Sequence, residues 1–248
     1  MMKFTVVIHA RYESNRFPGK PFARLGDRTI LQRVYERARY SQAERVIIAT
    51  DDERIAKAAT DFGAEVCMTS DQHKSGTERL AEVVAQQSLS DETVIVNLQG
   101  DEPFIGIDTI NQVAGLLLDS PDHGMATLCH VLASKEEITD PHIVKVVLDS
   151  NSDALYFSRA PIPWDRDQLC CIPCYRHIGL YAYTAKFLRD YVRMEPCELE
   201  KAEALEQLRV LYHGHKIKVG ITEEELAIGI DTPEDLERAK KILVPRAD

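Results

Sequence analysis

Short apolar runs alternate with amphipathic stretches along the first hundred residues, and this alternation restricts the fold more than any other feature of the chain. The apolar runs have the length of strands and lie at 4–9, 45–50, 65–69 and 93–100. The stretches between them have helical spacing and lie at 30–39, 51–63 and 75–86. A strand–helix–strand rhythm of this kind predicts an α/β fold with a doubly wound, mainly parallel sheet.

The second half of the chain has a less regular pattern, in which predicted strands follow one another after short connections. We predict strands at 125–131, 143–149, 154–158, 178–184 and 216–221. We predict helices at 185–193, 199–212 and 231–243, the last with Pro233 in its first turn. Consecutive strands favour antiparallel pairing. We therefore expect one compact domain over 1–248, with a small inserted subregion of mixed or antiparallel strands at roughly 133–200.

The charge and composition of the chain exclude some classes of binding partner. The formal net charge is -10 and the pI is about 5.3, whereas a protein that binds nucleic acid carries a basic surface. No apolar stretch reaches about 18 residues, the length of a membrane span. Cysteines in a long chain without a recognisable signal peptide are typical of a reducing compartment. We expect a cytoplasmic protein that binds neither nucleic acid nor membranes.

The loop after the first predicted strand, ARYESNRFPGKP at 10–21, concentrates positive charge. Arg11, Arg16 and Lys20 follow the carboxyl end of a buried strand, where open α/β sheets bind their ligands. Guanidinium and ammonium groups bind phosphate oxygens, so the loop is suited to a polyphosphate. It is neither a GxxxxGK[ST] phosphate loop nor a GxGxxG motif. From these residues alone, a solvated basic loop is an equal alternative.

Two acidic segments follow other elements of the predicted sheet. NLQGDEP places Asp101 and Glu102 just after a buried strand, and GIDTPED places Asp231 at the start of the last helix. Asp101 and Asp231 are together suited to Mg²⁺, which takes one or two carboxylates and completes its shell with water and phosphate oxygens. A metal beside a basic clamp is typical of phosphoryl or nucleotidyl transfer. The alternative for Asp231 is a favourable position at the positive end of the helix dipole.

A third group of polar side chains lies in the second half and suits a small acidic polyol. Its members are Arg159, Arg166, His177, Tyr181, Glu206 and Gln207. The cations bind a carboxylate, and the other side chains hydrogen-bond hydroxyl groups. The alternatives are structural. They are a surface pair of Arg166 with Asp165 or Asp167, a solvated helix face for Glu206, and a packing role for His177.

Segments spread along essentially the whole chain resemble, in the same order, the motifs of the 3-deoxy-manno-octulosonate (Kdo) cytidylyltransferases, or CMP-Kdo synthetases. The segments are the loop at 10–21, SGTERL at 75–80, QGDEP at 99–103, ALYFSRAPIPWDRD at 154–167, RHIGLYAY at 176–183, LEQLR at 205–209 and DTPEDLE at 231–237. The resemblance implies the nucleotide-diphospho-sugar transferase type of the doubly wound fold. It also implies an enzyme that is usually a homodimer.

The resemblance assigns roles to individual residues. It implies a nucleotide site made by Ala10, Arg11, Ser14, Arg16, Lys20, Ser75, Gly76, Thr77 and Gln99. It implies a sugar-acid site made by Gln99, Arg159, Arg166, His177, Tyr181, Glu206 and Gln207. The implied catalytic residues are Arg16, Lys20, Asp101 and Asp231, and the two aspartates are the implied ligands of a Mg²⁺ cofactor.

The implied reaction joins CTP and Kdo to give CMP-Kdo and pyrophosphate for lipopolysaccharide or capsule synthesis. The C2 hydroxyl of the sugar attacks the α-phosphorus in line, without a covalent enzyme intermediate. Arg16 and Lys20 stabilise the leaving pyrophosphate. Either Arg159 or Arg166 neutralises the carboxylate of the sugar.

The chain departs from the family pattern in two places that bear on the site. His9 stands where the family usually has proline; it restores a main-chain N–H and frees φ before the nucleotide loop, so we expect weaker nucleotide binding. The loop QLCCIPC at 168–174 is short, which makes 8-amino-3,8-dideoxy-manno-octulosonate an alternative sugar. Besides Cys170, this loop contains Cys171 and Cys174, which with His177 have the spacing of zinc ligands but lack a fourth.

Two other classes of function are open at this point. A catalytically weak protein that binds nucleotide sugars is favoured by His9 alone. A glycosyltransferase of related architecture would usually carry an Asp-x-Asp motif where this chain has GDEP. Pyrophosphate release distinguishes the cytidylyltransferase from both.

Overall fold

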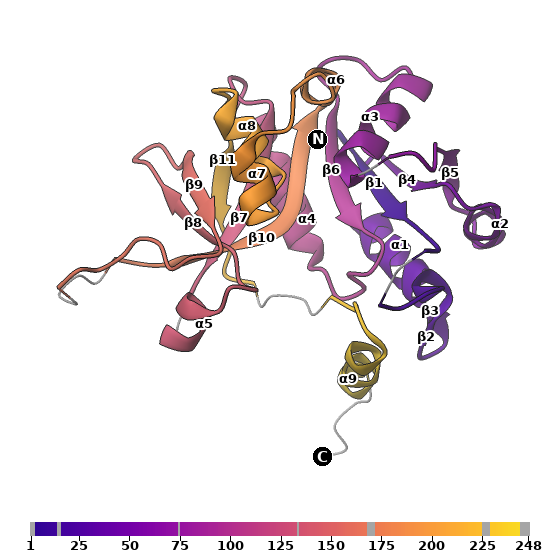
Figure 1. Cartoon of the computed structure of the whole chain (residues 1–248). Coiled ribbons are helices and arrows are strands. Elements are labelled where there is room, and N and C mark those ends of the chain that lie inside the picture. The colour runs from indigo at the N-terminus through magenta and orange to yellow at the C-terminus, as the bar shows by residue number, and fades with distance from the viewer. Residues whose placement is uncertain are drawn as a thin grey trace.

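A nine-stranded sheet forms the centre of the protein (Figure 1). The structure is a computed structural model and describes residues 3–13, 16–73, 75–132, 134–167, 172–224 and 229–243. The strands of the sheet are β1 (Phe4–Ala10), β4 (Arg45–Thr50), β5 (Glu65–Met68), β6 (Val94–Gln99), β7 (Met125–Val131), β8 (Lys145–Leu148), β9 (Ala154–Ser158), β10 (Tyr175–Thr184) and β11 (Lys218–Ile221). A separate small hairpin consists of β2 (Arg24–Leu25) and β3 (Arg28–Thr29).

The order of the strands confirms the predicted α/β fold with a mainly parallel, doubly wound sheet. Along its main path the order is β11-β7-β10-β6-β1-β4-β5. β1 lies between β4 and β6 and is parallel to both, and β4 is parallel to β5. β10 runs antiparallel between β6 and β7, and β11 is parallel to β7. Because β1 and β6 are parallel neighbours, the loops that follow them leave the sheet at the same edge.

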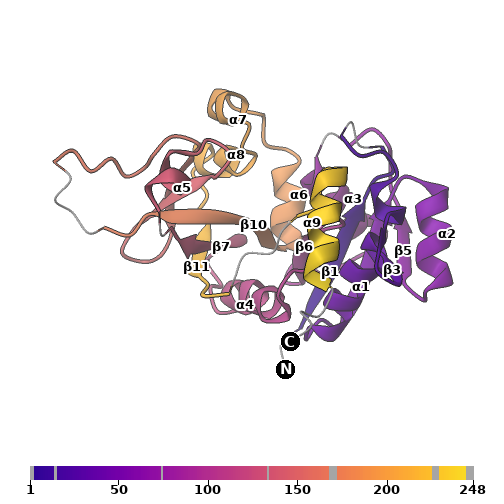
Figure 2. The same cartoon turned by 90° about the horizontal axis from the view of Figure 1, so that it is seen from below.

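Helices cover both faces of the sheet (Figure 2). They are η1 (Lys20–Phe22), α1 (Ile30–Tyr40), α2 (Glu53–Asp61), α3 (Gly76–Gln86), α4 (Ile107–Leu118), α5 (Lys135–Thr139), α6 (Ala185–Tyr191), α7 (Glu198–Glu203), α8 (Gln207–Tyr212) and α9 (Pro233–Leu243). In the part of the chain that the structure describes, no helix has both the length and the apolar character needed to cross a membrane.

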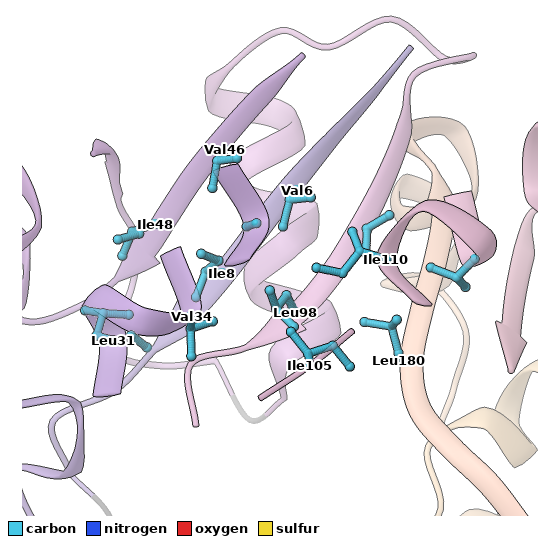
Figure 3. Close-up of a cluster of buried hydrophobic side chains, with 14 of the residues drawn as sticks. Val6, Ile8, Leu31, Val34, Val46, Ile48, Leu98, Ile105, Ile110 and Leu180 are labelled. Carbon is cyan, nitrogen blue, oxygen red and sulfur yellow. The ribbon is translucent and has the colours of Figure 1, made fainter. Parts of the chain in front are cut away.

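Two apolar cores flank the sheet because successive residues of a strand point to opposite faces. In β1, Val6 and Ile8 enter one core, and Val7 enters the other. Figure 3 shows the first core, where Leu31 of α1 and Ile110 of α4 lie among the strand side chains. The second core packs α3 and α6 against the opposite face. Burial on both faces holds β1 firmly, so the loop after it starts from a fixed position.

Several helices differ from the sequence-based predictions, and η1 and α5 were not predicted at all. α2 begins at Glu53, later than predicted, because the Asp52 side chain accepts the first free N–H groups as an N-cap. No helix was predicted at 107–118, where α4 lies. The single helix predicted at 199–212 is wrong: the chain forms α7 and α8, because Ala204 adopts a left-handed conformation with φ 51°. This break matters for the site.

β8 and β9 form a hairpin beside the main path of the sheet. β8 also pairs with the first residues of β10, Tyr175 and Arg176. The described residues between β9 and β10 extend away from the body of the protein as an arm (Figure 1). The rest of β10 pairs with β6 and β7, so the predicted subregion at roughly 133–200 shares this strand with the central sheet.

Candidate active site

A cavity opens at the edge of the sheet where β1 and β6 end. The register pairs His9 with Gln99, and the N–H of Gly100 donates to the carbonyl oxygen of His9 at 3.2 Å. A side-chain carbon on residue 100 would lie 2.9 Å from that oxygen, so this close approach requires glycine. This edge cavity has a volume of about 260 Å³. Its lining residues are His9, Ala10, Arg11, Glu13, Arg16, Lys20, Pro21, Gly100, Asp101 and Asp231.

Lys20 lies between two carboxylates in the edge cavity. Its Nζ donates to Oδ2 of Asp101 at 2.5 Å and to Oδ1 of Asp231 at 3.2 Å. η1 positions the lysine, since Gly19 turns the chain with φ 71° and Pro21 lies in the first turn. The Lys20 side chain is 13% exposed, which partly shields its ion pairs from water. At Lys20, the alternative of a freely solvated basic loop does not match the structure.

Asp231 reaches the edge cavity through a main-chain contact between distant segments. The N–H of Ile230 donates to the carbonyl oxygen of Asp101 at 2.9 Å. The start of α9 is capped by other residues: Asp235 Oδ2 accepts the N–H of Thr232 at 3.0 Å, and Thr232 Oγ1 accepts the N–H of Asp235 at 3.2 Å. The helix therefore does not depend on the Asp231 carboxylate for its cap, and that carboxylate faces the basic loop.

The two arginines of the basic loop point to different acids. Arg16 Nη2 lies 3.1 Å from Asp231 Oδ2 and remains two-thirds exposed. Arg11 donates to the carbonyl oxygen of His73, and its Nε lies 3.8 Å from Asp51 Oδ2. Both side chains line the edge cavity. A polyphosphate entering this cavity would meet two guanidinium groups and one ammonium group.

The two aspartates of the edge cavity fit a divalent cation. The Lys20 ammonium contacts both carboxylates, which shows that one cation can reach both. Among the described residues, no group of three or more His, Cys, Asp or Glu side chains is placed to hold a metal, so the protein would supply two carboxylates. Burial, with the charges of Asp101 and Asp231, raises the pKa of Glu102 to about 8, so Glu102 is protonated at neutral pH. Two carboxylates with water and phosphate oxygens suit Mg²⁺.

A second cavity, the inner cavity, lies among β6, β10, α3 and α8 and has a volume of about 290 Å³. Its lining residues are His9, Gly76, Thr77, Asn97, Gln99, Met125, Gly179, Tyr181, Tyr183, Tyr191, Ala204, Leu205, Glu206, Gln207 and Val210. The structure thus brings together several predicted residues, namely Gly76, Thr77, Gln99, Tyr181, Glu206 and Gln207. They come from segments far apart in the sequence.

His9 lines both cavities and marks the junction between them. The imidazole lies against the start of α3: a side-chain carbon on Gly76 would be 3.0 Å from its Nε2. The positive end of the α3 dipole therefore lies beside the ring. Burial lowers the pKa of His9 to about 4, so the neutral ring offers one donor and one acceptor at physiological pH. His9 affects the shape of the junction as well as the start of the loop.

The break between α7 and α8 carries Glu206 and Gln207 to the inner cavity. The left-handed Ala204 turns the chain just before them. Thr77 Oγ1 donates to Glu206 Oε2 at 3.2 Å, and burial raises the pKa of Glu206. Gln207 is 5% exposed. Glu206 is an exposed residue, as in the alternative of a solvated helix face, yet its carboxylate also lines the inner cavity.

His177 lies beside the inner cavity and does not line it. Its Nε2 is 3.1 Å from Thr127 Oγ1. Its ring centroid is 5.3 Å from that of Tyr181, which is a lining residue. Burial lowers the pKa of His177 to about 3, so the ring is neutral. These contacts fit the packing alternative, and a sugar-binding role for His177 stays a prediction.

Arg159 and Arg166 also lie outside the set of residues that line the inner cavity. Arg159 donates to the carbonyl oxygens of Glu203 at 2.7 Å and Pro141 at 3.0 Å, and so holds the end of α7 against the 140s segment. Arg166 has an 89% exposed side chain and lies 3.5 Å from Asp167 on the arm, as in the surface-pair alternative. Their predicted contact with a sugar carboxylate stays a prediction.

Ser75 and the loop at 168–174 complete the predicted set. Ser75 caps α3, since its hydroxyl accepts the N–H of Glu78 at 3.2 Å. Ser14, Cys170 and Cys171 lie outside the described residues, so the predictions made for them stay predictions. Cys174 is a free thiol.

The inner cavity contains residues that we did not predict from the sequence: Asn97, Tyr183 and Tyr191. Asn97 precedes Gln99 by two positions in β6, and Tyr183 follows Tyr181 by two positions in β10. Side chains two residues apart lie on the same face of a strand, so Asn97 and Tyr183 could have been predicted from the positions of Gln99 and Tyr181. Tyr191 ends α6 and had no comparable signal, because its position depends on how α6 packs.

Proteins of known identity are similar to this chain over almost its whole length. The cytidylyltransferase family model matches residues 5–217. Curated relatives named 3-deoxy-manno-octulosonate cytidylyltransferase include those of Vibrio cholerae serotype O1 and Photobacterium profundum. They are 51% and 50% identical to this chain, over 99% and 98% of it and 100% of each relative.

Solved structures agree with these sequence relatives. A CMP:2-keto-3-deoxy-manno-octonic acid synthetase complexed with CTP is 39% identical, has a TM-score of 0.91, and is matched over 97% of this chain and 98% of its own. A 4-diphosphocytidyl-2C-methyl-D-erythritol synthase shares the fold, with a TM-score of 0.65 and 12% identity, over 98% of this chain and 100% of its own.

The parallel sheet, the edge site and these similarities define a nucleotidyltransferase of the cytidylyltransferase class. The two curated relatives named above match along their full length and bear the same name. The chain belongs to the 3-deoxy-manno-octulosonate cytidylyltransferase family.

Proposed function

We propose that this chain transfers CMP from CTP to the anomeric hydroxyl of Kdo and so forms CMP-Kdo and pyrophosphate. The observation that carries the proposal is that the two cavities meet at His9. The edge cavity contains basic side chains paired with carboxylates, and the inner cavity beside it is buried and polar. Relatives named for this activity support Kdo as the sugar and do not favour the 8-amino sugar or a mere binding protein. The product would serve lipopolysaccharide or capsule synthesis.

In-line displacement suits the two joined cavities. The phosphates of CTP occupy the edge cavity, where Arg16 and Lys20 exchange carboxylate partners for phosphate oxygens. The sugar occupies the inner cavity with its anomeric hydroxyl at the junction. The hydroxyl oxygen bonds to the α-phosphorus, the bond from that phosphorus to the bridging oxygen breaks, pyrophosphate leaves, and the hydroxyl proton passes to solvent. Positioning and charge neutralisation supply most of the rate enhancement in such reactions.

Mg²⁺ is the proposed cofactor, and Asp101 and Asp231 would hold it. The support is the convergence of both carboxylates on the single Lys20 ammonium. When bound, Mg²⁺ neutralises charge on phosphate oxygens and lowers the pKa of a coordinated hydroxyl. Arg16, which lies beside Asp231, would then turn towards the departing phosphates.

A homodimer is the proposed assembly, and the cytoplasm, where cells make CTP, is the proposed location. Large apolar side chains are exposed on the β8–β9 hairpin and the arm: Leu155 is 61%, Ile172 59% and Trp164 77% exposed. A second copy that covered them would remove apolar surface from water. Light scattering of the purified protein at several concentrations measures the assembly directly.

We expect pyrophosphate release from CTP when the protein is supplied with Mg²⁺ and Kdo. The assay is run in parallel with 8-amino-Kdo, which we expect to be the poorer substrate, and with Asp101→Ala as the inactive control. Omission of Mg²⁺ tests the cofactor in the same plate. A protein that released no pyrophosphate with either sugar would not be a cytidylyltransferase for these substrates.

Replacing His9 with proline should lower the KM for CTP several-fold. The ring of proline fixes φ at the entry to the basic loop, so less conformational entropy is lost when the phosphates bind. His9→Ala, which removes the imidazole without fixing φ, separates the two effects. A KM for CTP that is the same in His9→Pro and the wild type contradicts this expectation.

A further inference from the structure

Three buried polar atoms in the wall of the inner cavity lack hydrogen-bond partners among the described residues. They are Oδ1 of Asn97, the hydroxyl of Tyr191 and Nε2 of Gln207. The three residues are 8%, 2% and 5% exposed. They come from β6, from the end of α6 and from the start of α8.

Such atoms are rare in folded proteins because leaving a buried donor or acceptor unpaired costs free energy. A single buried polar atom without a hydrogen-bond partner can result from imperfect packing. Three that line the same cavity point to a partner that enters it, and that partner must carry several hydrogen-bonding groups.

Asn97 and Tyr191 lie at the end of the inner cavity that faces away from the phosphates, and Gln207 lines the same cavity. Asn97 precedes Gln99 by two residues, so it lies deeper along β6 than the edge where that strand ends. β10 is antiparallel to β6 and pairs Thr184 with Val94, so α6 starts at the opposite edge of the sheet from Asp101. Tyr191, at the end of α6, therefore enters the cavity from the side remote from the edge cavity.

On the proposed function, the reacting end of the sugar lies at the junction by His9, and the rest of the molecule extends inward. We infer that Asn97, Tyr191 and Gln207 bind the C7–C8 diol of the sugar acid and so determine the length and hydroxylation of the accepted substrate. A hydroxyl group can donate to the amide oxygen of Asn97 and accept from the amide N–H of Gln207. The phenol of Tyr191 can do either.

The chemistry of Gln207 also separates the two sugars considered for this chain. Its Nε2 is a donor and needs an acceptor. A hydroxyl oxygen supplies one, whereas a charged ammonium group has three donors and no acceptor. Gln207 Nε2 therefore finds an acceptor in a hydroxyl group and none in an ammonium group, whereas Asn97 Oδ1 accepts from either.

Tyr191→Phe tests the inference because it removes one hydroxyl and keeps the ring. We expect the KM for Kdo to rise about five- to tenfold, as the loss of one hydrogen bond predicts, with the KM for CTP unchanged. The second variant, Gln207→Met, removes the amide donor at similar length and should show the same selective loss. Tyr40→Phe is the matched control, since Tyr40 is 75% exposed on α1.

A truncated sugar shows which part of the substrate Tyr191 contacts. The six-carbon acid 2-keto-3-deoxygluconate lacks C7 and C8, so its inhibition constant against Kdo should be the same in wild type and Tyr191→Phe. An unchanged KM for Kdo in both variants, or an equal loss with the six-carbon acid, would overturn the inference. Wild-type protein that releases no pyrophosphate would instead overturn the proposed function, so the two failures are distinct.

Discussion

Asp101→Asn should lower kcat for pyrophosphate release by about 10²–10³-fold, the usual effect of removing one preorganised electrostatic group at a reacting centre. Asparagine has the same shape, so the loss is one of charge. Asp101 accepts the shortest contact of Lys20 in the edge cavity, at 2.5 Å, and is one of the two carboxylates that face it. The amide leaves Asp231 alone to hold a cation, and the KM for Kdo should change little because the inner cavity is untouched.

Steady-state kinetics with both substrates varied measures this effect. Asp119→Asn is the matched control, because Asp119 is exposed at the end of α4 and outside both cavities. A kcat for Asp101→Asn within threefold of the wild type would show that the edge cavity does not hold the reacting phosphate.

Lys20→Met should abolish most activity and also make the stability of the protein depend on Mg²⁺. Without the ammonium group, the Asp101 carboxylate loses the lysine and the Asp231 carboxylate keeps only its exposed pair with Arg16. Asp231 is 48% exposed, so solvent reduces the repulsion, and we expect a loss of about 1–2 kcal/mol in the free energy of unfolding. For a chain of this size that lowers Tm by about 2–8 °C.

Thermal melting with and without millimolar Mg²⁺ tests the second half of this prediction without any substrate. Mg²⁺ should raise the Tm of Lys20→Met more than that of the wild type, because in the wild type the lysine competes for the same carboxylates. Lys20→Arg keeps the charge and should melt close to the wild type. An equal response to Mg²⁺ in Lys20→Met and the wild type would show that the aspartates do not form a shared cation site.

The sequence by itself determined the main strands and helices of the first half and located the charged residues of the edge cavity. The strands and helices up to Gln99 have strong, regular periods, and the predicted β1 and β6 place their loops at one edge because parallel neighbours end together. Arg16, Lys20, Asp101 and Asp231 lie in motifs next to such strand ends or helix starts. The positions of these motifs in the sequence therefore pointed to the four residues, and the structure places all four around the edge cavity.

Only the tertiary structure decided the composition of the inner cavity. A continuous helical pattern hid the break at Ala204, whose left-handed backbone ends α7 just before Glu206 and Gln207. Tyr191 joins them from α6 because α6 and α8 pack into the same core. Arg159 matched a motif, yet its guanidinium group binds main-chain carbonyl oxygens. Residue type and spacing along the chain specify what a side chain can bind, whereas long-range packing decides what it faces.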